Sequence, residues 1–295
     1  MQGWRKVVEW CTGWTLLGCA SVTILAVLLI FFFLASEGLP ALLEVPLASL
    51  LDERWTPVSF VNPRFGLLPL VAGTVLITVL ATVLALPFGV GGAVYLADFA
   101  GQKEREILKP FIEVLAGIPS VVLGFFGLVV IGPWLKRLFE LPSGLTALCG
   151  AVLLAFMAIP TMLSIAEDAL RAVPGSYRDA SLALGATPWQ TTFRVSLPAA
   201  SSGVVAAVML GIGRVIGETM AVMMVTGNAA LITASPFESV RTMTATIAAE
   251  MGEVPFGSEH YHVLFLVGLV LLSMTLVVNL YARRLLVRRI RRNKA

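Results

Sequence analysis

The sequence predicts an all-α membrane protein with six membrane-spanning helices, on the basis of its apolar composition, six long uncharged runs and an uneven distribution of basic residues. Of its 295 residues, 58% are hydrophobic and 13% are charged, and the mean hydropathy is +0.90. Soluble domains usually contain about 25% charged residues. The chain therefore has too little polar surface for a soluble fold, which excludes the soluble classes of protein.

Six runs are long enough to cross a bilayer, because about 20 apolar helical residues span its hydrocarbon core of about 30 Å. The first, Trp14 to Ser36, is too long for the apolar part of a cleaved signal peptide and is followed by no small-residue cleavage site, so we expect it to remain as an anchor. The predicted spans are approximately 14–36, 67–97, 112–135, 143–168, 198–226 and 262–282.

The basic residues predict the orientation, because Lys and Arg beside spans are retained in the cytoplasm. With both termini cytoplasmic, fifteen of the 21 Lys and Arg residues fall in inner segments and five in outer segments, while Arg214 lies inside the fifth span. We therefore predict a cytoplasmic N-terminus at 1–13, a transmembrane domain at 14–282 and a basic cytoplasmic tail at 283–295. The tail is expected to contact anionic membrane lipid, and nucleic-acid binding is not expected.

The inner segment 171–198, between the fourth and fifth spans, is long for a turn and strongly patterned. Ser176 follows a Pro-Gly pair and is expected to cap a helix from Tyr177 to Leu184. Gly185 is expected to end that helix in the left-handed conformation, and Thr187-Pro188 to begin a second short helix. Two short helices joined at a glycine form a rigid protrusion that suits docking on another protein.

This segment resembles a signature of the permease subunits of bacterial ABC importers: Glu-Ala-Ala, three residues, Gly, nine residues, Ile, one residue, Leu-Pro. Here Asp179-Ala180-Ser181 precedes Gly185 at that spacing, and Val195 to Pro198 follows it; Asp179 replaces Glu and Ser181 replaces the second Ala. The resemblance implies that a separate ATPase docks on this loop. The residues implicated in coupling are Tyr177, Arg178, Asp179, Ala180, Ser181, Gly185, Ala186, Thr187, Leu197 and Pro198.

Two membrane stretches, 113–124 and 211–222, are similar to the first of the two permeases of the phosphate-specific importer, in the binding-protein-dependent transport permease family. The resemblance implies the type I ABC importer architecture in the bacterial inner membrane. It also implies four kinds of partner: a second permease that completes a heterodimer, two cytoplasmic ATPase subunits, an extracytoplasmic phosphate-binding protein and membrane lipid. The chain has no Gly-Lys dipeptide and hence no phosphate loop, so ATP and Mg are expected on the ATPase subunits. The chain itself is expected to be neither an enzyme nor a cofactor-binding protein.

Arg214 and Glu218 lie in the fifth span, where a charge is costly and is kept mainly beside a pathway or a partner. Four residues apart in one predicted helix, they would share a face. Either they form an ion pair that only locks packing, or Arg214 binds a tetrahedral oxyanion through paired hydrogen bonds and Glu218 helps to release it. In the resembling family this Arg and Glu are tied to transport, which favours the second interpretation. Thr219 adds a hydroxyl beside them.

Three further residues are candidates for a pathway or gating role: Glu113, Pro119 and Ser120. Glu113 is as well explained by a charge at the end of the third span, and Pro119-Ser120 by a simple kink. His260 and His262 supply too few ligands for a metal site, so none is expected.

The sequence as a whole predicts a permease subunit that moves inorganic phosphate into the cytoplasm by alternating access, driven by separate ATPases. Permeases for molybdate or sulfate share the loop signature and remain an alternative. A secondary transporter is a weaker alternative, because it would need no docking loop. A membrane enzyme is disfavoured because no catalytic cluster is visible in the sequence.

Overall fold

The computed structural model describes residues 2–59 and 62–292, and the side chains of residues 10–59, 62–281 and 284. Most of the described chain is helical. The long helices are α1 Gln2–Gly38, α4 Leu68–Val94, α5 Gln102–Ala116, α8 Ala147–Arg171, α12 Ser201–Gly217 and α15 Glu259–Arg292.

The long helices are joined by short elements. The short helices are α2 Ala41–Glu44, α3 Leu47–Leu50, α6 Ser120–Phe126, α7 Gly132–Leu138, α9 Gly175–Ala183, α10 Pro188–Thr191, α11 Leu197–Ala199, α13 Met220–Val225 and α14 Met243–Glu250. Three π-helical segments are η1 Tyr95–Phe99, η2 Gly127–Ile131 and η3 Thr192–Ser196. Two strands, β1 Trp55–Thr56 and β2 Arg64–Phe65, pair antiparallel with Trp55 opposite Phe65.

Among the described residues, six helical stretches are long and apolar enough to cross a membrane when a bent pair counts as one span, which confirms the predicted all-α fold. Five are continuous: Trp10–Glu44, Leu68–Phe99, Ser120–Leu138, Ala147–Arg171 and Glu259–Tyr281. The sixth is the pair Pro188–Ala199 and Ser201–Gly217, whose axes differ by 74°.

Two predicted spans differ in detail from the structure. The third begins at Ser120 rather than at 112, because α5 is a separate helix and Pro119, in an extended conformation, precedes α6. The fifth does not continue to 226: α12 ends at Gly217, Glu218 is extended at φ −70° and ψ 132°, and α13 begins at Met220. The Arg214 segment therefore lies at the end of a broken helix.

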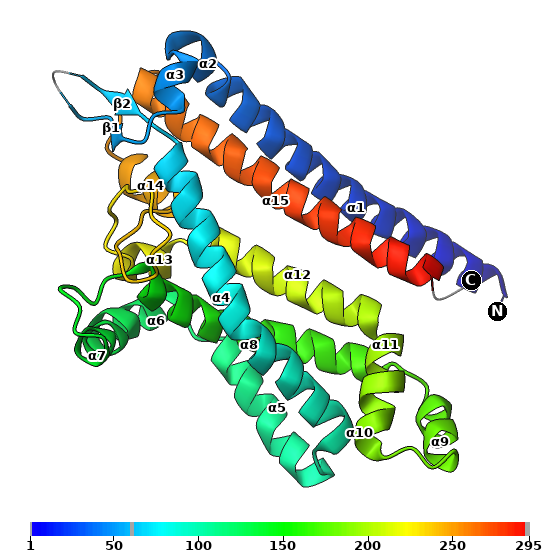
Figure 1. Cartoon of the computed structure of the whole chain (residues 1–295). Coiled ribbons are helices and arrows are strands. Elements are labelled where there is room, and N and C mark those ends of the chain that lie inside the picture. The colour runs from blue at the N-terminus through cyan, green and yellow to red at the C-terminus, as the bar shows by residue number, and fades with distance from the viewer. Residues whose placement is uncertain (1, 60–61, 293–295) are drawn as a thin grey trace.

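The core is centred on α8, which lies between α4 and α12 (Figure 1). Its cluster of buried residues joins apolar side chains of α4, α8, α12 and α13. At Gly211 and Gly203 of α12, an added Cβ would collide with Met162 and Ala169 of α8. These glycines let the two helices approach closely, as small residues commonly do between membrane helices.

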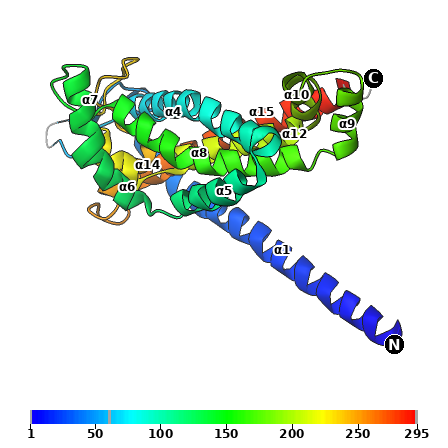
Figure 2. The ribbon, with the colours of Figure 1, turned by 90° about the horizontal axis from the view of Figure 1, so that it is seen from below.

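The two termini lie at the same end of the molecule as α9 and α10, which we call the loop end (Figure 1). The strands, α2, α3 and α14 lie at the opposite end, which we call the hairpin end. The end of α1 near Gly38 packs against α15, whereas the N-terminal part of α1 diverges from α15 and projects away from the bundle (Figure 2). The last residues of the expected basic tail, 293–295, and the side chains of residues 1–9 lie outside the described residues.

A charged network at the hairpin end is centred on Glu250, the last residue of α14. Its carboxylate accepts hydrogen bonds from His260 Nε2 at 2.9 Å and from Trp55 Nε1 at 3.1 Å, and pairs with Arg241 at 2.8 Å. Burial raises the pKa of Glu250, but the hydrogen bonds from His260 and Trp55 and the charge of Arg241 outweigh it, so the pKa lies below its ordinary value. Within the described residues, no three His, Cys, Asp or Glu side chains form a possible metal site.

We predict that Glu250→Gln lowers the stability of the protein at pH 7 by about 1–3 kcal/mol, because it removes charge-assisted hydrogen bonds. A lowered pKa means that the ionised carboxylate stabilises the fold above about pH 4.3, and that this contribution disappears as the pH falls through the folded-state pKa. The gap in melting temperature between wild type and variant, measured from pH 7 to pH 3.5, should therefore shrink. Glu253→Gln, at an exposed position nearby, is the control, and a gap independent of pH would contradict the assignment.

Candidate functional site

The three residues predicted to lie on a pathway are in the last turn of α12 and in the break that follows it. Arg214 is in the last turn of α12, and its Nε atom is buried without a hydrogen-bond partner in the described structure. Glu218 and Thr219 form the break itself, where Glu218 Oε1 lies 3.5 Å from the Ala221 amide and Thr219 Oγ1 donates to the Gly217 carbonyl at 3.2 Å. A buried guanidinium nitrogen without a partner is costly, so its retention calls for an explanation.

The prediction that Arg214 and Glu218 share a helical face was wrong, because the helix ends between them at Gly217. Among the side chains that the structure describes, these two form no ion pair within 4.0 Å. The charge of Arg214 is therefore not neutralised by Glu218 in this conformation. This leaves the guanidinium group available for another anion.

The break is held in place by α14, a contact that the sequence did not reveal. Thr244 Oγ1 donates to the Glu218 carbonyl at 2.9 Å. At the start of the same helix, the Met243 amide donates to Thr74 Oγ1 of α4 at 3.0 Å. Thr244 lies 26 residues after Glu218, and no local pattern signals such a contact.

The loop between α8 and α12 has the predicted form of two short helices at a glycine corner. Gly185 has a φ of +84°, the left-handed conformation expected of it. Thr187 caps α10 and exchanges hydrogen bonds with Gln190, as the start of the second helix requires. The first helix begins at Gly175 after Pro174, so Ser176 is inside it and the predicted cap was wrong: proline, which needs no amide partner, already fixes the chain there.

Arg178 fixes the loop to the transmembrane bundle. Its guanidinium donates to the Leu170 carbonyl at 2.9 Å and to Ser196 Oγ at 3.1 Å, and it pairs with Asp98 at 2.8 Å. Ser181 shares a hydrogen bond of 2.9 Å with Thr191, which joins α9 to α10. Two of the residues predicted to contact a partner thus face the protein's own helices.

The other predicted coupling residues divide into an exposed set and a set at the bend. Tyr177 is 55% exposed, and two loop residues outside the predicted set, Leu184 and Trp189, are 89% and 62% exposed. The predicted contacts Asp179, Ala180, Gly185 and Thr187 are exposed too, and Ala186 is half-buried. Leu197 and Pro198 instead form α11 at the 74° bend that leads into α12.

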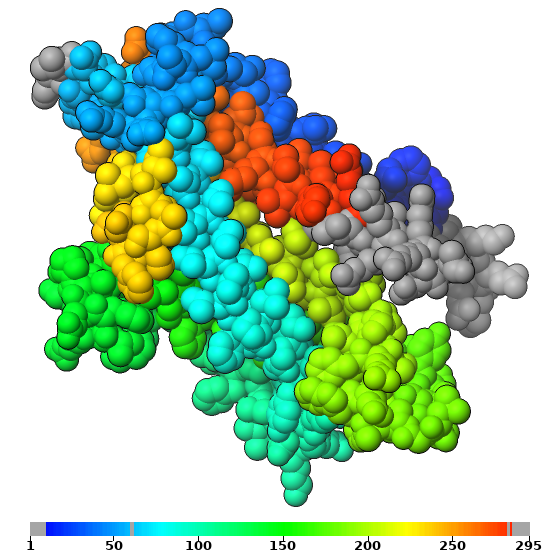
Figure 3. All heavy atoms as spheres, in the orientation of Figure 1, coloured from blue at the N-terminus to red at the C-terminus, as the bar shows by residue number. Residues whose placement is uncertain are grey.

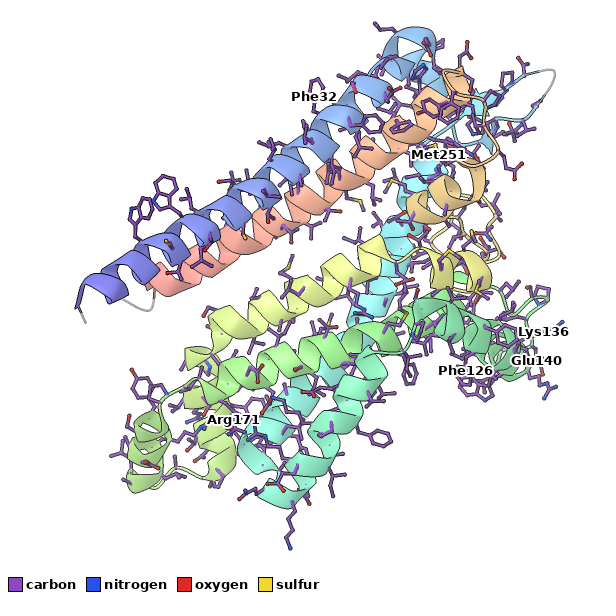
Figure 4. All side chains as sticks on the ribbon, turned by 180° about the vertical axis from the view of Figure 1, so that it is seen from behind. Phe32, Phe126, Lys136, Glu140, Arg171 and Met251 are labelled. Atoms are coloured by element: carbon purple, nitrogen blue, oxygen red, sulfur yellow. The ribbon has the colours of Figure 1, made fainter. Side chains whose placement is uncertain are left out.

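A second charged cluster lies at the loop end around Glu167 of α8, whose side chain is 1% exposed. Arg105 and Lys109 of α5 pair with this carboxylate at 2.6 and 2.8 Å, and Arg171 lies 3.6 Å away. The hydrogen bond to Glu167 raises the pKa of Lys109, against the opposite effect of burial. Figure 4 shows Arg171 in this region, far from Lys136 at the other end of the molecule.

The weaker candidates Glu113, Pro119 and Ser120 lie on two other segments, α5 and the start of α6. Glu113 lines an open cavity of about 690 Å³ at the loop end, together with Arg105, Lys109 and Arg171. Pro119 and Ser120 form a different helix break, between α5 and α6, and in the described part of the chain they make no hydrogen bond to the α12–α13 segment. Helix α6, which Ser120 begins, nevertheless packs against α13 after the α12 break, with Gly124 next to Ala221 and Met224.

The sequence matches one known protein family over most of its length. A family model described as "Binding-protein-dependent transport system inner membrane component" matches residues 86–292. The chain belongs to this family. The permease is therefore a multi-pass inner membrane component, and its relatives are transport subunits rather than enzymes.

Similar proteins are found among transport permeases. The permease is 39% identical to the probable ABC transporter permease protein YqgH of Bacillus subtilis (strain 168) over 274 residues, which cover 92% of this chain and 88% of the relative. It is 34% identical to the phosphate transport system permease protein PstC of Mesorhizobium japonicum, over 81% of this chain and 78% of the relative. PstC 1 of Mycobacterium tuberculosis is 36% identical over 79% and 75%, respectively.

Solved structures show the same fold. A bacterial ABC transporter for import of the acidic polysaccharide alginate aligns over 98% of this chain and 99% of its own, with a TM-score of 0.65 and 14% identity. The inward-facing MetNI methionine ABC transporter aligns over 76% and 94%, with a TM-score of 0.57 and 21% identity. These likenesses confirm the predicted ABC importer permease fold.

We predict that Gly185→Ala loosens the loop, because a residue with a Cβ in the left-handed conformation costs about 1–2 kcal/mol. No atom lies within 4 Å of the position of the new Cβ, so backbone strain is the only penalty. Amide hydrogen exchange around residues 182–187 should accelerate roughly 5- to 30-fold. Gly175→Ala, where space is equally open and φ is not positive, is the matched control. Equal exchange rates in both variants would contradict the prediction.

Proposed function

We propose that this permease is one membrane subunit of an ATP-driven importer that moves inorganic phosphate into the cytoplasm by alternating access. The observation that carries the proposal is Arg214, a cationic side chain at the break of a membrane helix with a buried, unpartnered Nε. The similarity to PstC phosphate transport permeases supports phosphate as the substrate. No feature of the described residues favours molybdate, sulfate or a secondary transporter.

The chemistry of the break suits transient binding of an oxyanion. A guanidinium group presents paired N–H donors that match two oxygens of a phosphate. Glu218 is outside the α12 helix and close to the start of α13, so it does not occupy the guanidinium in this conformation. In our proposal, movement of the broken helix brings Glu218 toward Arg214 and displaces the anion, and Thr219 contributes a hydroxyl to the path.

The loop 171–198 supplies the link to the energy source in this proposal. Its exposed side chains Tyr177, Leu184 and Trp189 offer an apolar surface for a groove on an ATPase subunit. Arg178 keeps that surface rigid relative to the membrane helices. The loop end, with both termini, then faces the cytoplasm, as the distribution of basic residues requires.

The proposed complex contains this chain, a second permease, two ATPase subunits and an extracytoplasmic phosphate-binding protein. ATP and Mg bind to the ATPase subunits, and this chain holds no cofactor. The hairpin end, where Phe256 is 90% exposed, faces the binding protein in this arrangement. Membrane lipid covers the exposed apolar side of α1, and nucleic acid has no role.

Reconstitution of the complete complex tests the proposal. The permease, coexpressed with an ATPase, a second permease and a phosphate-binding protein from the same organism, is expected to copurify with the ATPase and to accumulate phosphate in proteoliposomes only when ATP is supplied. Molybdate and sulfate, offered in parallel with their uptake measured, should not be accumulated. Phosphate flux through this chain alone, without ATP, would instead identify a secondary transporter.

We predict that Arg214→Gln reduces phosphate uptake at least tenfold while the complex still assembles. The variant removes a charged donor whose hydrogen bonds to an anion are each worth about 1.5–3 kcal/mol. Arg214→Lys keeps the charge but loses the paired N–H donors, so its phosphate uptake should lie between that of wild type and that of Arg214→Gln. Radiolabelled phosphate uptake and ATPase copurification are the measurements, and Arg137→Gln on the exposed surface of α7 is the control. Normal uptake by Arg214→Gln would refute a pathway role.

A further inference from the structure

Asp98 is a buried carboxylate at the loop end that the sequence did not single out. It lies in η1, directly after α4, and its side chain is 6% exposed. Arg178 of the loop forms an ion pair with its Oδ1 atom at 2.8 Å, in a geometry that is not that of a hydrogen bond. Thr192 of η3, itself 2% exposed, donates to its Oδ2 atom at 2.8 Å.

These contacts join three membrane helices at the root of the loop. Arg178 also binds the Leu170 carbonyl at the end of α8 and the Ser196 hydroxyl before α12. Asp98 adds α4 to this set. Figure 3 shows the loop packed against the adjoining part of α4 and α5, and a ring contact of 5.9 Å between Phe99 and Trp189 extends the same junction.

The backbone around Asp98 and Thr192 has an unusual helical form. Both Asp98 and Thr192 lie in π-helical turns, η1 and η3. Such turns insert an extra residue into a helix and occur frequently at functional sites. The hydrogen bond from Thr192 to Asp98 joins these two turns, and the ion pair between Asp98 and Arg178 adds α9. Removal of either charged partner would leave the other charge without compensation.

Helix α4 connects the Asp98 contacts at the loop end with the hairpin end of the molecule. At the hairpin end, Thr74 of α4 accepts the Met243 amide, and Gly73 packs directly on the backbone carbonyl of Arg241. From the same segment, Thr244 holds the Glu218 carbonyl at the break beside Arg214. One helix therefore contacts both the loop and the segment that holds the proposed anion site.

We propose that Asp98 is a positioning residue for energy coupling, which makes α4 move together with the loop when the ATPase subunits close. The backbone and the Arg178 contacts tie the loop to α8 and α12. Through Asp98, the same displacement reaches α4, then α14, and then the Glu218 carbonyl. This inference rests on the proposed function, since it assumes that an ATPase acts on the loop.

Asp98→Asn tests the proposal in the complete complex, because it keeps the shape of the side chain and removes its charge. ATP hydrolysis is expected to stay within about twofold of wild type, while phosphate uptake per ATP falls roughly tenfold, in line with one pairwise coupling energy. Asp98→Glu should restore part of the coupling. Asp52→Asn, which breaks an exposed ion pair of 2.7 Å with Arg64 at the hairpin end, is the control and should leave the ratio unchanged.

Thr192→Val is a second variant that loses one hydroxyl and keeps the size of the side chain. It should lower uptake per ATP about threefold and should have little further effect in the Asp98→Asn background, since both act on one junction. If Asp98→Asn does not assemble, Thr192→Val decides the question. A wild-type ratio of phosphate to ATP in Thr192→Val, or in Asp98→Asn where that variant assembles, would overturn the proposal.

A distance measurement separates this proposal from the choice of substrate. Spin labels at Leu68 of α4 and Leu138 of α7 should change their separation when non-hydrolysable ATP is added to the complex, and the change should be lost in Asp98→Asn. This readout requires no transported substrate. If phosphate uptake is absent in wild type while the ATP-dependent change depends on Asp98, the phosphate assignment fails and the coupling role stands. An ATP-dependent change that persists in Asp98→Asn refutes the coupling role.

Discussion

The need to satisfy polar groups in the bilayer governs the arrangement of this permease. A helix that ends within the membrane leaves carbonyl groups without partners, and hydrocarbon offers none. The break after Gly217 meets this requirement with the hydroxyl of Thr244, which explains why the segment after α13 folds back against α4 instead of extending into solvent. The Nε of Arg214 is an exception to that rule, since it is buried and unpartnered. The Glu218 carbonyl at this break has a partner in Thr244, whereas packing alone does not account for the unpaired Nε of Arg214.

The sequence predicted features that depend on neighbouring residues and missed those that depend on distant ones. The all-α class, the glycine corner at Gly185 and the helix that begins at Thr187-Pro188 follow from local composition and spacing, and the structure contains each of them. The break after Gly217 was missed because the apolar run continues through it, and its stabilising partner lies 26 residues away. Asp98 was missed for the same reason: its meaning comes from Arg178 and Thr192, which lie in a different part of the chain.

The loop shows how one short segment performs two tasks. A partner can transmit force through a surface loop only if the loop does not bend, because a flexible loop would absorb the displacement. Here the polar side chains of Arg178 and Ser181 face the protein's own helices, whereas Tyr177 and Leu184 are exposed. The resemblance to the importer signature implied that Tyr177, Arg178 and Ser181 all take part in coupling to a partner. In the structure Arg178 and Ser181 stiffen the loop, whereas Tyr177, Leu184 and the signature residue Asp179 are exposed, and in our proposal the exposed set docks on the ATPase.

The position of α4 determines how a movement of the loop would reach the rest of the membrane helices. Helices α8 and α12 adjoin the loop in the chain, so any movement of the loop reaches them through the backbone. Helix α4 is not adjacent to the loop in the chain, and among the described residues Asp98, directly after α4, contacts the loop through Arg178 and Thr192. Because α4 packs against α8 along much of its length and holds α14 at its far end, its movement in phase with α8 preserves the core, whereas independent movement would separate packed surfaces. In our proposal, the buried ion pair between Asp98 and Arg178 therefore keeps α4, α8 and α12 moving as one unit.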